Sequence, residues 1–154
     1  MTVEMKKLHY FKEFIENERN ALGCNIYIMA LAIEAYYEFA SEILIPSSSR
    51  SMTQFKLLEE LRTLKIVSED EFVIMNETRK LKNELTHRLD YQIDMKNLHD
   101  FCNNCHVKDK ITPQNKENQE ELDAALLDGL LKSYKVIDLK LYSKVRKELE
   151  KVYA

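Results

Sequence analysis

The sequence predicts an all-α fold, an antiparallel bundle of about five or six helices. The 154 residues include only 2 glycines and 2 prolines, whereas a β-rich fold needs turn residues at roughly 8- to 12-residue spacing. Apolar side chains instead recur at helical spacing along most of the chain. Hydrophobic residues make up 45% of the chain and charged residues 32%, a balance typical of a globular domain and not of a disordered one.

The first three predicted helices lie in the N-terminal half. An amphipathic helix is predicted for residues 4–20, and a second, nearly apolar helix for residues 24–45. Because the second helix has only a thin polar strip, we expect it to be the central and most buried one. Pro46 and the serines after it end this helix. A third helix is predicted for residues 53–65.

The fourth predicted helix begins at a capping-box pattern, Ser68 followed by Glu71, and ends near His87. Its core stripe follows helical spacing and consists of Ile74, Thr78, Leu81 and Leu85. Residues 89–91 are expected to be a connector, and a short helix is predicted to begin at Asp94.

The C-terminal third divides into two segments. Residues 107–118 are polar and contain a proline, which predicts a linker or ordered loop. Residues 119–153 are helical by pattern, with Gly129 as a candidate break. We therefore predict one helical domain, with a core in residues 1–106 and a linker and helical tail in residues 107–154. The sequence leaves open whether this tail closes the bundle or projects toward a partner.

Composition and charge exclude several classes of function. Gly23 and Gly129 stand alone, so the chain has no glycine-rich loop of the Rossmann or P-loop type, and we expect no cofactor. The net charge of −3 comes from 23 basic and 26 acidic residues. This balance argues against a general polyanion binder, although it is compatible with a local basic patch.

The sequence also predicts where the protein resides. The N-terminal segment lacks the uninterrupted apolar stretch and cleavage site of a signal peptide. The longest apolar run, Ile26 to Ile33, is too short to span a bilayer. Three cysteines are an odd number for a disulfide framework. We therefore expect a cytoplasmic protein with reduced thiols and no membrane contact.

A polar stripe runs beside the core stripe of the fourth helix. Asn76, Arg79, Asn83 and His87 recur at spacings of three, four and four residues, which places them on one helical face. An imidazole can transfer protons near neutral pH, a guanidinium can stabilise charge on phosphate oxygens, and an amide can orient either one. This combination suits phosphodiester cleavage in RNA, where the 2′-hydroxyl is the nucleophile and no metal is needed. The simpler interpretation is a solvated helix face whose last turn carries basic residues that complement the helix dipole.

This motif resembles that of the HEPN superfamily, small helical domains that include RNases of toxin–antitoxin and phage-defence systems. Arg79, Asn83 and His87 match the pattern Arg-x-x-Gly-Asn-x-x-x-His found in domains associated with restriction subunits, with Lys82 in place of the glycine. Asn83 and His87 also match the Arg-Asn-x-x-x-His pattern of mannitol-operon-repressor-like proteins, with Lys82 in place of the arginine. The resemblance covers roughly residues 20–105.

The resemblance implies a metal-independent endoribonuclease. In this role His87 would be the general acid/base, Arg79 and Lys82 the phosphate contacts, and Asn83 the orienting amide. It also implies a homodimer that brings two motifs together around an RNA substrate, with an antitoxin or regulatory protein as partner. The alternative is a non-catalytic regulatory module that works by dimerisation and partner binding, because the lysine at position 82 offers a point charge and not a bidentate fork.

Two further groups of residues have alternative interpretations. Four N/S ligands occur within eight residues, and they give an alternative zinc site: His99, Cys102, Cys105 and His106. We expect no metal there, because structural zinc sites usually draw ligands from two separated segments. Glu34 lies either on the exposed strip of its helix, the preferred interpretation, or buried and facing Arg79 or His87. Tyr27, Tyr36 and Tyr37 are expected to be core or dimer-contact aromatics and not base-stacking platforms.

Overall fold

The computed structural model describes residues 2–20, 25–45, 52–87, 95–105, 107 and 119–153. Within these ranges, the side chains of residues 20, 87, 95–99, 119–122 and 152–153 lie outside the description. All regular structure in the described ranges is helical, so the predicted all-α bundle is confirmed. None of the described helices is long and apolar enough to cross a membrane.

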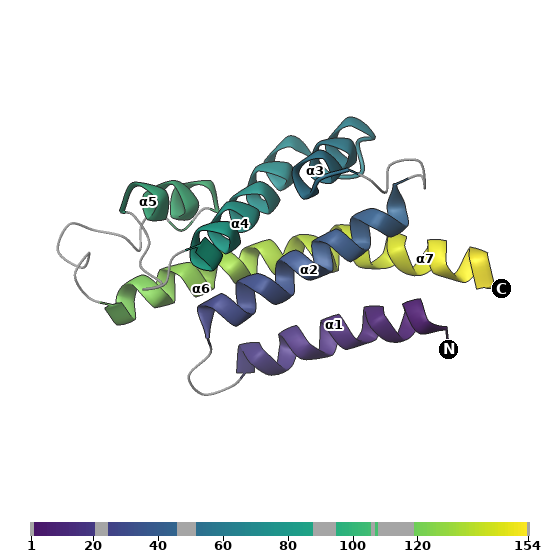
Figure 1. The fold of residues 1–154 in the computed structure, drawn as a ribbon, viewed down its shortest axis with the longest axis horizontal. Coiled ribbons are helices and arrows are strands. Elements are labelled where there is room, and N and C mark those ends of the chain that lie inside the picture. Colours follow the sequence, from purple (N-terminus) through teal and green to yellow (C-terminus); the bar gives the residue numbers. More distant parts are fainter. Residues whose placement is uncertain are drawn as a thin grey trace.

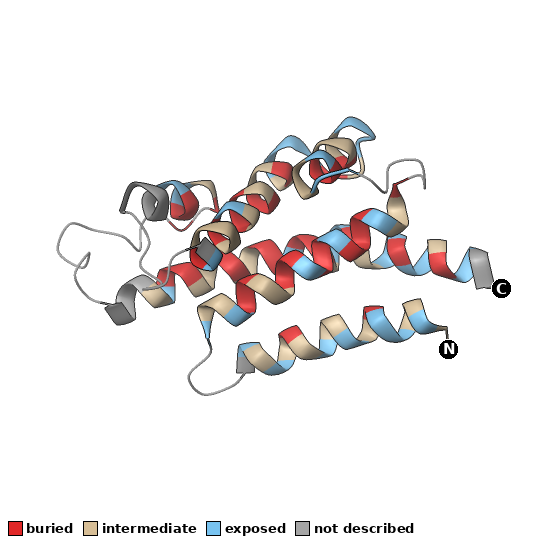
Figure 2. Cartoon of the chain, viewed as in Figure 1, coloured by how far each residue is buried: buried red, intermediate tan, exposed pale blue. Residues whose placement is uncertain are grey.

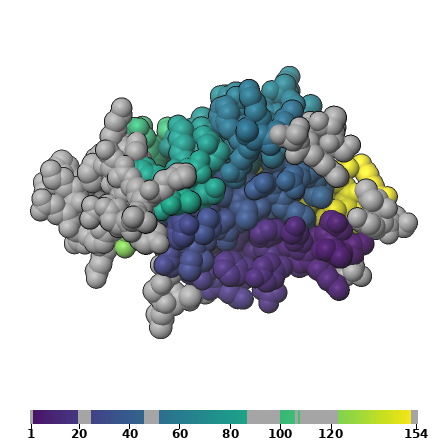
Figure 3. Space-filling view, viewed as in Figure 1, coloured from purple at the N-terminus to yellow at the C-terminus, as the bar shows by residue number. Residues whose placement is uncertain are grey.

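The central element is α2 (Ile26–Leu44), as the sequence predicts. It packs against α1 (Val3–Asn20), α3 (Gln54–Thr63), α4 (Glu69–His87) and the long C-terminal helix. In Figure 1, α2 runs between α1 on one side and the α3–α4 pair on the other. Figure 2 shows that buried residues extend along most of α2, and in Figure 3 its side chains fill the space between α1 and α3–α4.

Side-chain caps fix the starts of three helices. The side chain of Asn25 accepts a hydrogen bond from the backbone N–H of Ile28, and Thr53 caps α3 in the same way. At α4 the predicted capping box is present: Ser68 Oγ accepts from Glu71 N at 3.1 Å, and Glu71 Oε1 accepts from Ser68 N at 2.8 Å. The start of α4, and therefore the phase of its polar stripe, follows from local sequence.

The C-terminal tract is one continuous helical rod that closes the bundle. It consists of α6 (Gln119–Val136), a π-helical turn (Ile137–Leu141) and α7 (Tyr142–Tyr153). Both α6 and α7 pack against α2, and α6 also contacts α4 and α5 (Met95–Asn104). The predicted break at Gly129 is wrong, because the helix passes through this residue and departs from α-geometry only at the π-helical turn.

Buried hydroxyl groups connect the three central helices. The Tyr37 hydroxyl on α2 donates to the backbone carbonyl of Ser133 on α6, and Thr78 Oγ1 on α4 lies 2.6 Å from Ser133 Oγ. Tyr36 and Tyr37 are fully buried, as expected for core aromatics, and Tyr27 packs at the edge of the core. Because the hydroxyl groups of Tyr37, Thr78 and Ser133 partner one another, they hold α2, α4 and α6 in one register.

Candidate functional site

The candidate site lies on the second half of α4, where the polar stripe faces away from the core. Arg79 is held in place by two contacts. Its Nε donates to Asn76 Oδ1 at 3.0 Å, and its guanidinium lies 5.2 Å from the centre of the Phe55 ring on α3. The planar cation is therefore directed toward α3, on the side of α4 that adjoins α2.

Lys82 and Asn83 form the next turn of the stripe. Lys82 Nζ donates to Asn83 Oδ1 at 3.2 Å, and both residues are half-buried. Asn83 thereby has its carbonyl oxygen engaged, while its amide N–H groups can still donate to another group. The Lys82 ammonium is thus in contact with the Asn83 side chain.

Glu34 on α2 lies close enough to Arg79 and Lys82 to interact with both charges. The interpretation that it lies on the exposed strip is wrong, since only 1% of its surface is exposed. The strip runs through Ala35, Glu38 and Glu42, and Glu34 lies at its edge, where α3 covers it. Gln54 Nε2 of α3 donates to Glu34 Oε2. A helical-wheel plot of α2 places Glu34 at this edge. It cannot show that Glu34 is buried, because the helix that covers it, α3, comes from a separate part of the chain.

The environment of Glu34 favours its protonated form. Burial is the main cause that raises its pKa, to about 8, and the positive charges of Lys82 and Arg79 only partly oppose this effect. Glu34 Oε1 is buried and has no hydrogen-bond partner among the described residues. At neutral pH the carboxyl group is therefore mostly uncharged, and it does not neutralise the two cations beside it.

His87 is the last residue of α4, and its side chain lies outside the described residues. The position of its Cα follows from the helix. At a rise of 1.5 Å per residue, the Cα of His87 lies about 6 Å along the helix axis from that of Asn83 and about 12 Å from that of Arg79. The stripe therefore extends over a length comparable to two or three nucleotides.

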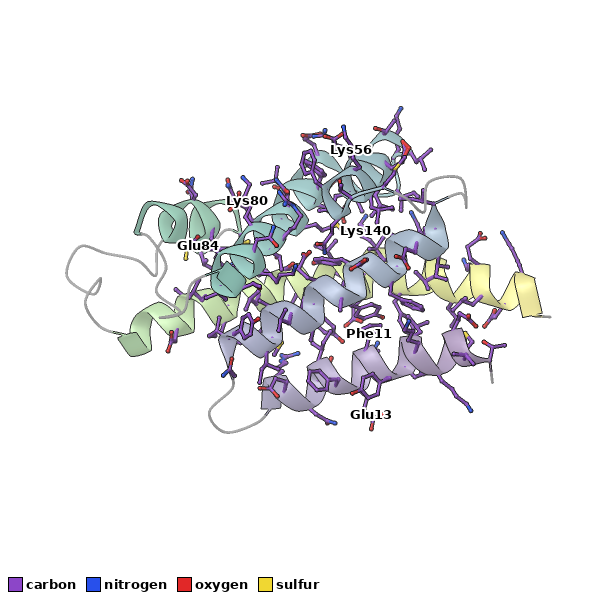
Figure 4. The ribbon with its side chains drawn as sticks, viewed as in Figure 1. Phe11, Glu13, Lys56, Lys80, Glu84 and Lys140 are labelled. Carbon is purple, nitrogen blue, oxygen red and sulfur yellow. The ribbon has the colours of Figure 1, made fainter. Side chains whose placement is uncertain are left out.

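The other flank of the stripe has the opposite charge. A cleft between α4 and α5 is lined by Glu77, Lys80, Leu81, Asn83, Glu84, Asp100 and Phe101. Lys80 pairs with Glu77 at 3.3 Å, and Lys80 and Glu84 lie on this side of α4 in Figure 4. Among the described lining residues, three carboxylates and one cation make this cleft less suited to a phosphate. The cations Arg79 and Lys82 lie on the α2–α3 flank, which suits an anion better.

The alternative zinc site is not assembled by the residues that can be described. Cys102 and Cys105 are buried free thiols, and burial raises their pKa values to about 11 and about 12. These shifts oppose the thiolate form that binds zinc. The described residues contain no group of three or more metal-ligating side chains, and the side chains of His99 and His106 lie outside the description.

Comparisons of the chain with protein-family models, curated proteins and solved structures found no match.

Proposed function

We propose that the protein is a HEPN-like, metal-independent endoribonuclease of a toxin–antitoxin or phage-defence system. The observation that carries this proposal is the pair of cations, Arg79 and Lys82, on one flank of α4, next to a carboxyl group that stays protonated at neutral pH. Such a flank keeps its positive charge for a phosphodiester. The two cations lie on the same helix as His87 and precede it by one to two turns, which supports the proposal.

The proposed reaction uses the substrate's own nucleophile. The ribose 2′-oxygen attacks phosphorus, the bond from phosphorus to the 5′-oxygen breaks, and the products end in a 2′,3′-cyclic phosphate and a 5′-hydroxyl. His87 removes the proton from the 2′-hydroxyl or delivers one to the leaving 5′-oxygen. In a homodimer, two copies of His87 would divide these roles. Arg79 and Lys82 stabilise the charge that develops on the phosphate oxygens.

Two residues, Phe55 and Glu34, would position Arg79 and Lys82 without touching the substrate. Phe55 supports the Arg79 guanidinium from α3, and Glu34 lies beneath Arg79 and Lys82 on α2. Asn83 is in contact with Lys82, and its amide N–H groups would donate to the imidazole or to a phosphate oxygen.

The test is cleavage of labelled single-stranded RNA in EDTA by the wild type and by His87→Ala. We expect cleavage by the wild type and a loss of at least about a hundredfold in the variant, typical of the removal of a general acid/base. His9→Ala, a histidine on α1, is the matched control and should retain wild-type activity. If neither the wild type nor the control cleaves RNA, the nuclease is ruled out, and a dimeric wild type would then favour the regulatory module.

A further inference from the structure

A row of lysines follows one face of the C-terminal helix, far from the candidate site. Four lysines recur at helical spacing across the π-helical turn and α7: Lys140, Lys144, Lys147 and Lys151. All four are exposed, whereas the opposite face of the helix is buried through Leu141, Val145 and Leu149. At 1.5 Å per residue this row extends over about 16 Å.

The turn between α3 and α4 widens this row at one end. Arg62, Lys65, Lys140 and Lys144 line one hollow, together with residues 66–68 and the carboxylates Glu69 and Glu71. Lys144 Nζ donates to the carbonyl of Ile66 at 3.3 Å, which fixes α7 against this turn. Lys140, labelled in Figure 4, extends from the π-helical turn toward α4, where it lies 4.0 Å from Glu71. We call these four cations, together with Lys147 and Lys151, the basic track.

The basic track has an excess of positive charge in a chain whose net charge is −3. Three carboxylates oppose its six cations: Glu69 pairs with Arg62 at 3.0 Å, Glu71 lies near Lys140, and Glu148 pairs with Lys151 at 3.2 Å. The side chains of Lys65 and Lys147 form no ion pair with any described residue. These two cations are therefore available to a ligand without the loss of an internal contact.

We infer that the basic track binds the phosphate backbone of single-stranded RNA and holds substrate that extends beyond the α4 site. This inference rests on the proposed function. Lysines aligned along a helix suit sequence-independent contacts to successive phosphates, whereas the cores of protein–protein interfaces are depleted of lysine and depend on aromatic anchors. Most of the described residues that line the hollow are charged, and none of them is aromatic.

The test measures binding separately from cleavage, by fluorescence anisotropy of a labelled RNA in which every ribose is 2′-O-methylated and cannot be cleaved. The variant Lys65→Gln/Lys147→Gln should weaken binding at least about tenfold near 0.1 M salt. It should also reduce the slope of log affinity against log salt by about 1.4, because each lost phosphate contact removes about 0.7 for a single strand. The matched control, Lys6→Gln/Lys7→Gln on α1, should bind as the wild type does.

The two proposals can fail independently. RNA binding that depends on the basic track, without cleavage by the wild type, would contradict the proposed nuclease activity. It would still support RNA binding by the basic track. Equal RNA binding by Lys65→Gln/Lys147→Gln and by the α1 control would overturn the proposal that the basic track binds RNA, whatever the cleavage result. Binding of polyglutamate that requires Lys65 and Lys147, with RNA affinity unchanged, would also overturn it and would assign the surface to an acidic protein segment.

Discussion

At the scale of single residues, Glu34 is the most informative side chain of the bundle. Burying a carboxyl group in an apolar helix is unfavourable unless it is paired or protonated. Among the described residues, the Glu34 carboxyl group accepts one hydrogen bond, from Gln54, and two cations of α4 lie nearby. Burial dominates, and the result is a raised pKa. The protonation state of Glu34 therefore depends both on its burial in the core and on the two cations of α4.

The raised pKa predicts how stability changes with pH. The pKa of Glu34 is about 8 in the folded chain and 4.5 when unperturbed. Between these values the native state keeps a proton that the unfolded state has lost, so the free energy of unfolding falls by about 1.4 kcal/mol per pH unit. This contribution is complete below pH 4.5 and is lost by about pH 8. Glu34→Gln, which has no proton to lose, should not show this slope.

Urea denaturation at pH 5.5, 6.5 and 7.5 measures the effect. Glu34→Gln should gain about 3 kcal/mol relative to the wild type between the first and last pH. Glu38→Gln, the exposed neighbour on α2, should retain the wild-type slope. Parallel pH profiles for the wild type and Glu34→Gln would show that Glu34 has no raised pKa.

At the scale of elements, the contact between α5 and α6 depends on a residue without a side chain. A Cβ atom added at Gly129 would lie 2.4 Å from Cε1 and 2.8 Å from Cζ of Phe101. Phe101 is buried on α5, with 2% of its surface exposed. The glycine therefore allows the Phe101 ring to lie directly against the backbone of α6, and its role is close approach and not a helix break.

Because of this packing, we expect Gly129→Ala to lower the free energy of unfolding, whereas the same change usually raises it within a helix. An exposed glycine within a helix should gain about 1 kcal/mol on replacement by alanine. Here overpacking against Phe101 should cost about 1–3 kcal/mol and outweigh that gain, so we expect net destabilisation of about 1 kcal/mol. Thermal or urea unfolding measures it, and a double-mutant cycle with Phe101→Leu should show coupling between the two positions. A variant more stable than the wild type would mean that the ring does not contact α6 as described.

At the scale of the whole molecule, local signals predict the helices well, while contacts between distant segments limit the prediction of the site. The capping box at Ser68 and the apolar content of α2 identify the start of α4 and the central helix, because both effects act within one segment. The position of Glu34 beneath Gln54, and of Phe55 against Arg79, depends on how α3 crosses α2 and α4. No periodicity within one helix encodes that crossing. For the same reason the sequence leaves open whether α6 and α7 close the bundle.

We propose that the α4 stripe cleaves RNA through the substrate's own 2′-hydroxyl. This is tested most directly with an all-ribose oligonucleotide and the same sequence in 2′-deoxyribose, each incubated in EDTA with the wild type and with His87→Ala. We expect cleavage of the ribose substrate alone, by the wild type alone, with a 2′,3′-cyclic phosphate on the product. Cleavage of the deoxyribose substrate, or equal cleavage of RNA by His87→Ala, would contradict it.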